Sequence, residues 1–183
     1  MSIKILAICP SIYPEKYSKM RDSFDITASQ YTEICIQPAF GVTEAINYSF
    51  ESNPDYDFYM ILNDDIVFET PLWDIQLAVP RMISYGNDGL QGENLCTFPM
   101  IDGDIVRALG WLQLPTLNRY CGDVVWRTIG KSLNILNYSP DVSIRHNWDE
   151  SQVDQDIHEK DMEKFAKWLA VSHRDINKVK AVL

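Results

Sequence analysis

The segment from Asp57 to Phe68 constrains the fold most, because an apolar run within it ends abruptly at two adjacent carboxylates. The run itself is Phe58-Tyr59-Met60-Ile61-Leu62, without a polar interruption. A strand of this kind is typical of a parallel α/β sheet, in which both faces are covered. Such sheets bind ligands at the carboxyl ends of their strands. Asn63, Asp64 and Asp65 follow at that position, which makes this end of the strand a candidate ligand site.

Two interpretations of the adjacent carboxylates stay open at this point. Two carboxylates at a strand end are costly unless a positive charge neutralises them, and Mg²⁺ or Mn²⁺ carrying a diphosphate would do so, since these ions prefer oxygen ligands. The alternative is a pair of turn aspartates in water, because Asn and Asp favour turns. The segment alone does not decide between them.

Length and composition indicate a single domain. The chain has 183 residues and a formal net charge of -10, and it contains no Gly/Ser/Pro-rich linker and no evident repeat. The acidic balance argues against an extended nucleic-acid surface, although it allows a local basic patch.

No apolar run reaches membrane-spanning length. The apolar stretch 3–8 is interpreted as a first strand and not as a signal peptide. Four scattered cysteines predict free thiols and a cytoplasmic location: Cys9, Cys35, Cys96 and Cys121.

The first third of the chain predicts alternating strands and helices. Strands are expected over 3–8, 33–37 and 57–62. Helices are expected between them, over 14–28 and from Gly41 to the break at Asn53-Pro54-Asp55. This β-α-β-α-β order is the signature of a mainly parallel sheet with helices on both faces.

The remainder has a less regular pattern. Residues 72–85 are predicted to be a helix that can break at Pro80, followed by a loop over 86–92. Expected next are a strand over 95–101, helices over 104–109 and 123–129 that each end before a glycine, and short strands over 133–136 and 141–145. A long helix from Ser151 to about Val171 is expected to pack across the sheet or on another subunit. Its acids are interpreted as a solvated face: Asp154, Asp156, Glu159 and Asp161.

Several motifs, taken in order, resemble a small family 2-type glycosyltransferase with the GT-A nucleotide-sugar fold. The resemblance spans roughly residues 3–148. Its motifs are Pro10-Ser11-Ile12-Tyr13, Gly41-Val42-Thr43-Glu44-Ala45-Ile46-Asn47, Ile61-Leu62-Asn63-Asp64-Asp65, Leu109-Gly110-Trp111, Gly122-Asp123-Val124-Val125-Trp126-Arg127-Thr128-Ile129-Gly130 and Ile144-Arg145-His146-Asn147-Trp148. The resemblance implies a GT-A-like domain over 1–150 with a C-terminal helical extension over 151–183.

Three positions depart from the family pattern. Asn63 stands where the first Asp of the Asp-x-Asp motif often stands, and Gly122 precedes Asp123 where the family usually has Glu. The strand ending at Gln37 and Pro38 lacks the acid that many members place near the nucleobase. The first departure bears on the metal site, the second on the catalytic base, and the third on recognition of the donor nucleobase.

The resemblance also implies roles for individual residues. Asp65 and His146 would bind Mn²⁺ or Mg²⁺, Asp123 would be the catalytic base, and Trp111 would contact the acceptor. The helix N-terminus is expected to favour the ionised form of Asp123 and so to weaken it as a base. The residues expected to bind the donor nucleotide are Pro10, Ser11, Tyr13, Asn47, Asn63, Asp64 and Asp65.

Each of these roles has a structural alternative. His146 shares a strand face with Val142 and Ile144, so it can equally be a hydrogen-bonded core histidine. Asp123 can be an N-cap, and Trp111 can simply be packed. A second Asp-x-Asp, Asp102-Gly103-Asp104, is interpreted as a turn and helix cap, because no long buried strand precedes it.

The leading functional prediction is a metal-dependent, hexosyltransferase-like enzyme that moves sugar from a nucleotide-diphosphate sugar to an acceptor hydroxyl with inversion at the anomeric carbon. The acceptor is open between a glycan, a protein, a lipid-linked sugar and a modified nucleobase. The alternatives are a non-catalytic nucleotide-sugar or glycan-binding domain and a nucleotidyltransferase. The latter normally has a Gly-rich phosphate loop, which residues 9–13 do not offer. An oligomer through the C-terminal helix and the absence of a membrane span are further expectations.

Overall fold

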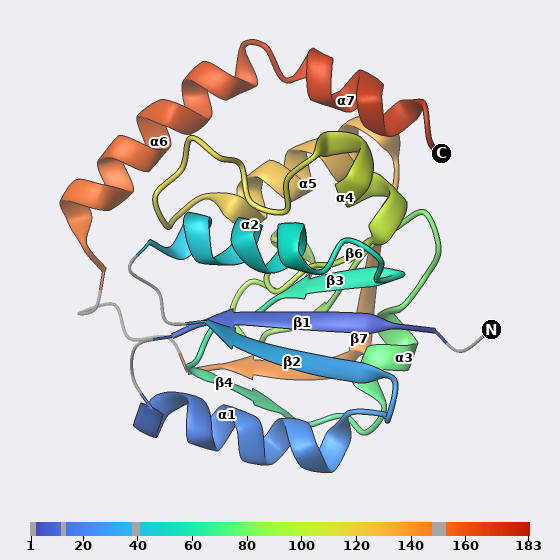
Figure 1. Cartoon of the computed structure of the whole chain (residues 1–183). Coiled ribbons are helices and arrows are strands. Elements are labelled where there is room, and N and C mark those ends of the chain that lie inside the picture. The colour runs from blue at the N-terminus through green and yellow to red at the C-terminus, as the bar shows by residue number, and fades with distance from the viewer. Residues whose placement is uncertain (1–2, 12–13, 38–40, 148–152) are drawn as a thin grey trace.

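A seven-stranded sheet forms the centre of the computed structural model, which describes residues 3–11, 14–37, 41–147 and 153–183. Figure 1 shows its strands running through the middle of the molecule. Their order is β2 (Thr32–Gln37), β1 (Ile5–Pro10), β3 (Phe58–Ile61), β6 (Met100–Asp102), β5 (Ile83–Asn87), β7 (Leu136–His146) and β4 (Ile66–Phe68).

Most strands of the sheet run in one direction. β1 pairs in parallel with β2 and β3, and β5 pairs in parallel with β7. β6 lies antiparallel between β3 and β5, and β4 lies antiparallel to β7 at the edge. The carboxyl ends of β1, β3, β5 and β7 therefore meet at one end of the sheet, which is where ligands bind in α/β proteins.

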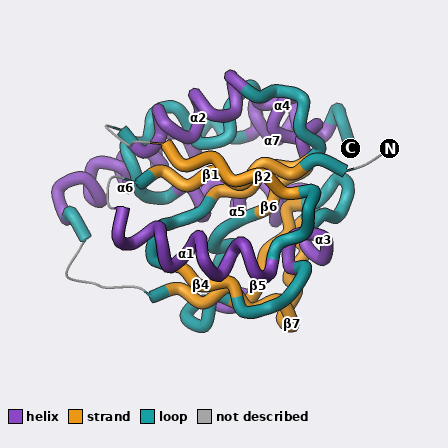
Figure 2. The backbone as a smooth tube through the Cα atoms, turned by 60° about the horizontal axis from the view of Figure 1, so that its bottom comes forward, coloured by secondary structure: helices purple, strands orange, loops and turns teal. Residues whose placement is uncertain are grey.

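Helices cover both faces of this sheet, as the sequence predicted. α1 (Pro14–Thr27) and α3 (Trp73–Leu77) pack on one face, and α2 (Val42–Ser52), α4 (Gly103–Leu109) and α5 (Gly122–Leu133) on the other. Figure 2 shows α1 on the opposite side of β1 and β2 from α2 and α4. α6 (Gln155–Leu169) and α7 (His173–Lys180) arch over the second helix layer in Figure 1.

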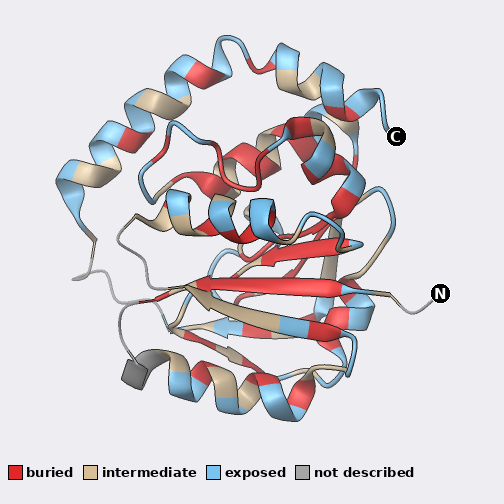
Figure 3. Ribbon diagram, viewed as in Figure 1, coloured by how far each residue is buried: buried red, intermediate tan, exposed pale blue. Residues whose placement is uncertain are grey.

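Alternation along the buried strands builds a core on each face. Leu6 and Ile8 of β1 belong to the core under α2, α4 and α5, whereas Ile5 and Ala7 belong to the core under α1 and α3. Figure 3 shows β1 and β3 as almost entirely buried. Burial on both faces explains the uninterrupted apolar run of β3.

The first third of the chain matches the predicted elements, but the prediction for residues 72–85 was wrong. The helix there ends at Leu77, and residues 83–87 form the central strand β5. Arg81, just after Pro80, has a left-handed backbone with φ 62°, a conformation that an α-helix cannot contain. The strand predicted over 95–101 is confined to Met100–Asp102.

Three further boundaries differ from the prediction. α5 continues through Gly130 to Leu133 and ends at Asn134, which takes the left-handed conformation that Gly130 was expected to supply. The two short strands predicted after α5 are one strand, β7. The C-terminal helix begins at Gln155 and is followed by α7, which was not predicted.

Within the described ranges, no helix combines the length and the apolar character that crossing a membrane requires. All four cysteines are free.

Candidate active site

The carboxyl end of β3 carries the two adjacent aspartates, and its neighbours in the sheet bring other polar groups to them. Ser11 follows β1, and its hydroxyl donates a 2.5 Å hydrogen bond to Asp64 Oδ2. β4 starts immediately after Asp65 and pairs with the end of β7, with Ile66 opposite His146. Residues separated by more than 50 positions in the sequence therefore meet at this end of the sheet.

Asp65 and His146 face each other across this pairing. Asp65 Oδ1 lies 3.4 Å from His146 Nε2, and the His146 side chain is 8% exposed. Asp65 Oδ1 is itself buried and accepts no hydrogen bond from the described residues. A buried carboxylate oxygen in this state is costly unless a cation reaches it.

The strand face of His146 is the one that the core alternative required. Val142 and Ile144 of the same face are buried in the α1–α3 core, and the His146 ring packs edge-on against Phe98 at 5.0 Å. His146 N also donates to the carbonyl of Asp88 at the end of β5. The histidine is thus partly a packing residue, but its Nε2 atom is directed toward Asp65.

These atoms fit a divalent cation with two protein ligands. Carboxylate oxygen and imidazole nitrogen both bind such ions at about 2.0–2.2 Å. Two ligands at that radius are about 3 Å apart in an octahedral arrangement and about 3.4 Å apart in a tetrahedral one, which brackets the observed Asp65–His146 separation of 3.4 Å. No cluster of three His, Cys, Asp or Glu side chains with metal-site geometry occurs in the described part of the chain.

Asp123 lies at the start of α5 and is close enough to His146 and Asp88 for their charges to act on its carboxyl group. Burial is the strongest influence on its carboxyl and raises its pKa, as does the charge of Asp88, whereas hydrogen bonds from the backbone N–H groups of Val124 and of Asp123 itself and the proximity of His146 lower it. The net direction is upward. The expectation that the helix N-terminus dominates and makes Asp123 a weaker base was wrong, because burial outweighs the helix field here.

The N-cap alternative for Asp123 is also not what the structure contains. The N-cap of α5 is Cys121, which has a left-handed backbone and makes no side-chain capping bond. Asp123 is the second residue of the helix, and its Oδ1 accepts from Val124 N at 2.8 Å. The carboxylate is therefore oriented by the helix start without capping it.

Comparison with known proteins gives structural neighbours only: no family model and no curated sequence matches the chain. The catalytic domain of Drosophila beta1,4-galactosyltransferase 7, solved with xylobiose, superposes with a TM-score of 0.60 at 10% identity, covering 83% of this chain and 74% of that one. S. aureus TarS gives 0.56 at 11% identity, covering 78% of this chain but only 36% of TarS. A197 from STIV gives 0.53 at 16% identity, covering 81% and 87%.

The chain has a GT-A glycosyltransferase fold. At these identities the likeness establishes the fold alone. The GT-A fold and the mainly parallel α/β architecture predicted from the sequence are thereby confirmed.

The side chain of Gln113 fills the space beside Gly122, the residue before Asp123. The carboxamide of Gln113 lies against the Cα of Gly122 and occupies the space that a Cβ there would need. Gln113 is 3% exposed, and its Oε1 is buried without a hydrogen-bond partner among the described residues. A polar side chain is thus packed against the residue that precedes Asp123. Sequence analysis missed it, because no local pattern links residue 113 to residue 122.

Two predicted ligand contacts are engaged within the protein instead. Asn47 accepts from the N–H groups of Leu112 and Gln113 at 2.9 Å, and it donates to the carbonyl of Gln113 at 2.8 Å. Trp111 is 7% exposed and packs on Trp126, with ring centroids 5.6 Å apart. These contacts favour the packing alternative for Trp111 and make Asn47 a clamp on the segment that carries Gln113.

The remaining donor-site predictions are only partly located. Pro10 ends β1, and Asn63 is exposed just beyond β3. Tyr13 lies outside the described residues, so its predicted contact with the donor stays a prediction.

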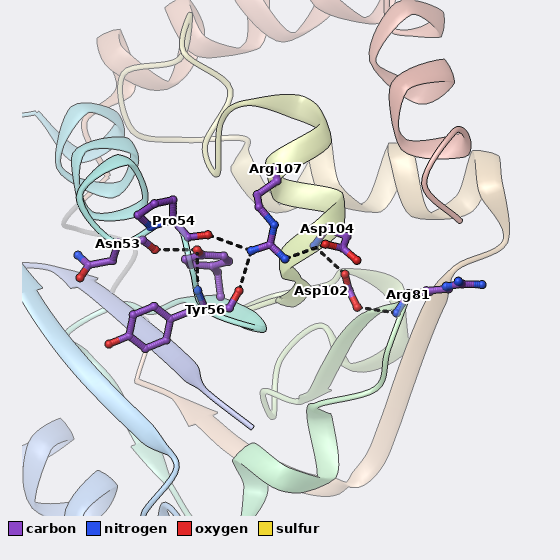
Figure 4. A network of polar contacts seen from close by, with 8 residues as sticks. Asn53, Pro54, Tyr56, Arg81, Asp102, Asp104 and Arg107 are labelled. Carbon is purple, nitrogen blue, oxygen red and sulfur yellow. Dashed lines mark hydrogen bonds and ion pairs between the residues drawn. The ribbon is translucent and has the colours of Figure 1, made fainter. Parts of the chain in front are cut away.

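The second Asp-x-Asp motif is the turn and cap that the sequence predicted. Asp102 is the N-cap of α4, where its Oδ1 accepts from Asp104 N, and its Oδ2 accepts from Arg81 N. Asp104 pairs with Arg107, whose guanidinium also donates to the carbonyls of Pro54 and Tyr56, as Figure 4 shows. These carboxylates are satisfied within the protein.

One acid of the C-terminal helix contradicts the solvated-face interpretation. Asp161 is fully buried and accepts four hydrogen bonds, from the backbone N–H groups of Asn118, Arg119 and Tyr120 and from the Asn118 amide. These bonds lower its pKa despite its burial. The interpretation failed because the partners are backbone groups of a distant loop, which leave no trace in the sequence of α6.

Proposed function

We propose that the chain is a metal-dependent glycosyltransferase of the family 2 type, which transfers sugar from a nucleotide-diphosphate sugar to an acceptor hydroxyl with inversion. The observation that carries the proposal is the position of His146 Nε2, 3.4 Å from Asp65 Oδ1. This carboxylate oxygen is buried and accepts no hydrogen bond from the described residues. This convergence lies at the carboxyl end of a GT-A sheet, with Asp123 nearby. A similar solved structure is a galactosyltransferase.

Asp65 and His146 would hold Mn²⁺ or Mg²⁺, and the donor diphosphate and water would complete its coordination. When bound, the ion supplies Lewis-acid stabilisation of the negative charge on the departing diphosphate. Asp64 is held by the Ser11 hydroxyl and would orient the ribose or a water bound to the ion. The carboxylate pair thus divides into one metal ligand and one orienting group.

Asp123 would remove the proton of the acceptor hydroxyl. The acceptor oxygen forms a bond to the anomeric carbon while the bond from that carbon to the diphosphate oxygen breaks, so the configuration inverts. The pKa of Asp123, raised by burial, makes its carboxylate a stronger base than an ordinary aspartate, as long as it is ionised at the working pH. Gln113 beside Gly122 would supply a neutral hydrogen-bonding group to the same substrate.

A non-catalytic nucleotide-sugar or glycan-binding domain is the second candidate. It is favoured by the absence of a third protein ligand near Asp65 and His146 among the described residues. It is also favoured by Gly122, which stands where the resembled family usually has Glu before the catalytic carboxylate. The two candidates differ in whether a bound donor is consumed.

The test is hydrolysis of a panel of nucleotide-diphosphate sugars without acceptor, with Mn²⁺ or with EDTA. We expect hydrolysis of one donor with Mn²⁺ and background rates with EDTA or in Asp65→Ala. Asp104→Ala, which removes an exposed carboxylate of the other Asp-x-Asp motif, should behave as the wild type. Metal-dependent binding without hydrolysis would support the nucleotide-sugar-binding domain. If no donor is bound or hydrolysed, both the transferase and the nucleotide-sugar-binding domain are refuted.

A further inference from the structure

A cavity of about 310 Å³ lies between α5, η1 (Gly92–Asn94) and the strands β5 and β7. It is distinct from the Asp65–His146 site, since it opens near the start of β7 and His146 ends that strand. We call it the α5 cavity. Its lining residues are Tyr85, Glu93, Asn94, Arg127, Lys131, Leu136 and Tyr138.

Two cations on one wall of the α5 cavity lack partners among the described residues. Arg127 and Lys131 form no ion pair there, although the chain carries 26 acidic against 16 basic residues. Arg127 Nε is buried without a hydrogen-bond acceptor in that part of the chain. A buried guanidinium N–H without an acceptor is unfavourable. An anionic ligand would satisfy both cations, since arginine and lysine are the usual residues that bind carboxylate and phosphate.

The other walls suit a sugar. Tyr85 and Tyr138 lie side by side with ring centroids 5.3 Å apart, and Glu93 and Asn94 offer oxygen and nitrogen atoms at the rim. Aromatic rings beside two cations that have no partner among the described residues therefore favour a sugar that carries a carboxylate or phosphate over a bare anion or a neutral sugar.

The α5 cavity is aligned with the candidate base along one helix. Asp123, Arg127 and Lys131 are spaced four residues apart on α5 and so lie on the same side of it. The rise of an α-helix places the two cations about 6 Å and about 12 Å along the axis from Asp123. Two residues beyond the lining residue Asn94, the Cys96 thiol donates to the carbonyl of Asp123, which connects the segment after η1 to the start of α5.

We propose that the α5 cavity binds an anionic sugar, and that this sugar belongs to the acceptor. The second part rests on the proposed function, whereas the binding itself does not. An acceptor held in this way would present a hydroxyl to Asp123 while its charged group lies beside Arg127 and Lys131.

The experiment titrates the full-length chain, without metal or donor, with glucuronate, glucose 6-phosphate, glucose and inorganic phosphate, followed by ¹H–¹⁵N NMR. Both charged sugars should bind saturably and at least tenfold more tightly than glucose or inorganic phosphate. Arg127→Met/Lys131→Met should weaken them at least tenfold. Lys19→Met/Arg174→Met removes the same charge at exposed positions of α1 and α7 and should bind as the wild type.

Several outcomes would overturn the inference. Binding that is absent, equal for charged and neutral sugars, or equally weakened in both double variants would do so, and inorganic phosphate binding as tightly as glucose 6-phosphate would refute the sugar part. Misfolding is controlled by the melting temperature, which should not fall in Arg127→Met, because this side chain has no hydrogen bond or ion pair to lose within the described residues. The titration needs no turnover. Its failure would refute the sugar site in the α5 cavity, whereas failure of the donor-hydrolysis test would refute the proposed function.

Discussion

Two carboxylate pairs stand at opposite ends of the same sheet and are used differently. Asp64 and Asp65 follow the carboxyl end of β3, whereas Asp102 pairs with Phe58 at the start of that strand. Both oxygens of Asp102 accept backbone N–H groups at 2.8 Å, and Asp104 pairs with Arg107 at 2.8 Å (Figure 4). Asp65 Oδ1, by contrast, is buried and accepts no hydrogen bond among the described residues.

The difference teaches how to separate an architectural Asp-x-Asp motif from a ligand site. A carboxylate whose oxygens are occupied by N–H donors needs no further partner, and its contribution is to stability. A buried oxygen without a donor costs free energy unless a cation binds it, so such an oxygen marks a candidate ligand site. Spacing in the sequence does not distinguish the two motifs, but the hydrogen-bond partners do.

The largest expected effect is on nucleotide affinity. Asp65→Ala should weaken Mn²⁺-dependent binding of the preferred nucleoside diphosphate by at least about a hundredfold, or about 2.8 kcal/mol, because a metal ligand is lost. Asp102→Ala should leave the affinity unchanged. Isothermal titration calorimetry with Mn²⁺ and with EDTA measures both variants. Equal, metal-independent binding by Asp65→Ala and the wild type would remove the distinction between the two pairs.

The next largest effect is on transfer by Asp123→Asn. This change keeps the side-chain shape and the oxygen that accepts from Val124 N but removes the proton acceptor. We expect sugar transfer to fall about a hundredfold or more, with donor affinity and folding nearly unchanged. Single-turnover transfer assays beside calorimetry separate the two quantities. Transfer at a near wild-type rate would mean that the base is another residue.

A smaller effect is expected on stability, where Asp102→Ala should have the larger effect and Asp65→Ala the smaller one. Asp102→Ala removes the N-cap of α4 and the acceptor for Arg81 N, so the free energy of unfolding should fall by about 1–2 kcal/mol. Asp65→Ala loses no hydrogen bond to a described residue and removes a buried oxygen without a donor, so it should not lower the free energy of unfolding in EDTA. Urea denaturation in EDTA measures both. A larger loss in Asp65→Ala than in Asp102→Ala would contradict the comparison.

The sequence predicted the first half of the fold because its signals are local. The β1-to-β3 segment alternates clear apolar strands with amphipathic helices, and its order implies the parallel pairing. β5 was missed because Ile83 and Tyr85 suit a helix as well as a strand, and nothing local indicates that β6 inserts between β3 and β5. Long-range strand order is decided by packing, which a local pattern does not contain.

The candidate site was predictable only where a motif marked it. Asp65 and His146 were proposed together from the resemblance, and the pairing of Ile66 with His146 brings them within 3.4 Å. Their role as metal ligands stays a prediction. Gln113 and Asp161 could not be found in the same way, because their roles come from contacts with Gly122 and with a distant loop. The sequence contains those residues but not their proximity.

The smallest expected effect is that of Asp123→Asn on stability, and it tests whether pH acts differently on the stability contributed by a candidate catalytic carboxylate and by an architectural one. Burial raises the pKa of Asp123 above its ordinary 3.8 in the folded protein, so its ionisation opposes folding; this penalty is complete above the raised pKa and disappears as the pH falls below 3.8. Asp123→Asn should therefore be at least as stable as the wild type at pH 7, and the difference should vanish near pH 3.

The pKa of Asp161 is lowered by its hydrogen bonds, so its ionisation stabilises the fold above 3.8, and this stabilisation is lost as the pH falls through the lowered pKa. Asp161→Asn should be less stable than the wild type at pH 7, since an amide NH₂ would face the N–H donors of Arg119 and Tyr120. Unfolding free energies from urea denaturation between pH 3 and pH 8 give both curves, and a loss of stability at pH 7 in Asp123→Asn would class Asp123 with the architectural carboxylates.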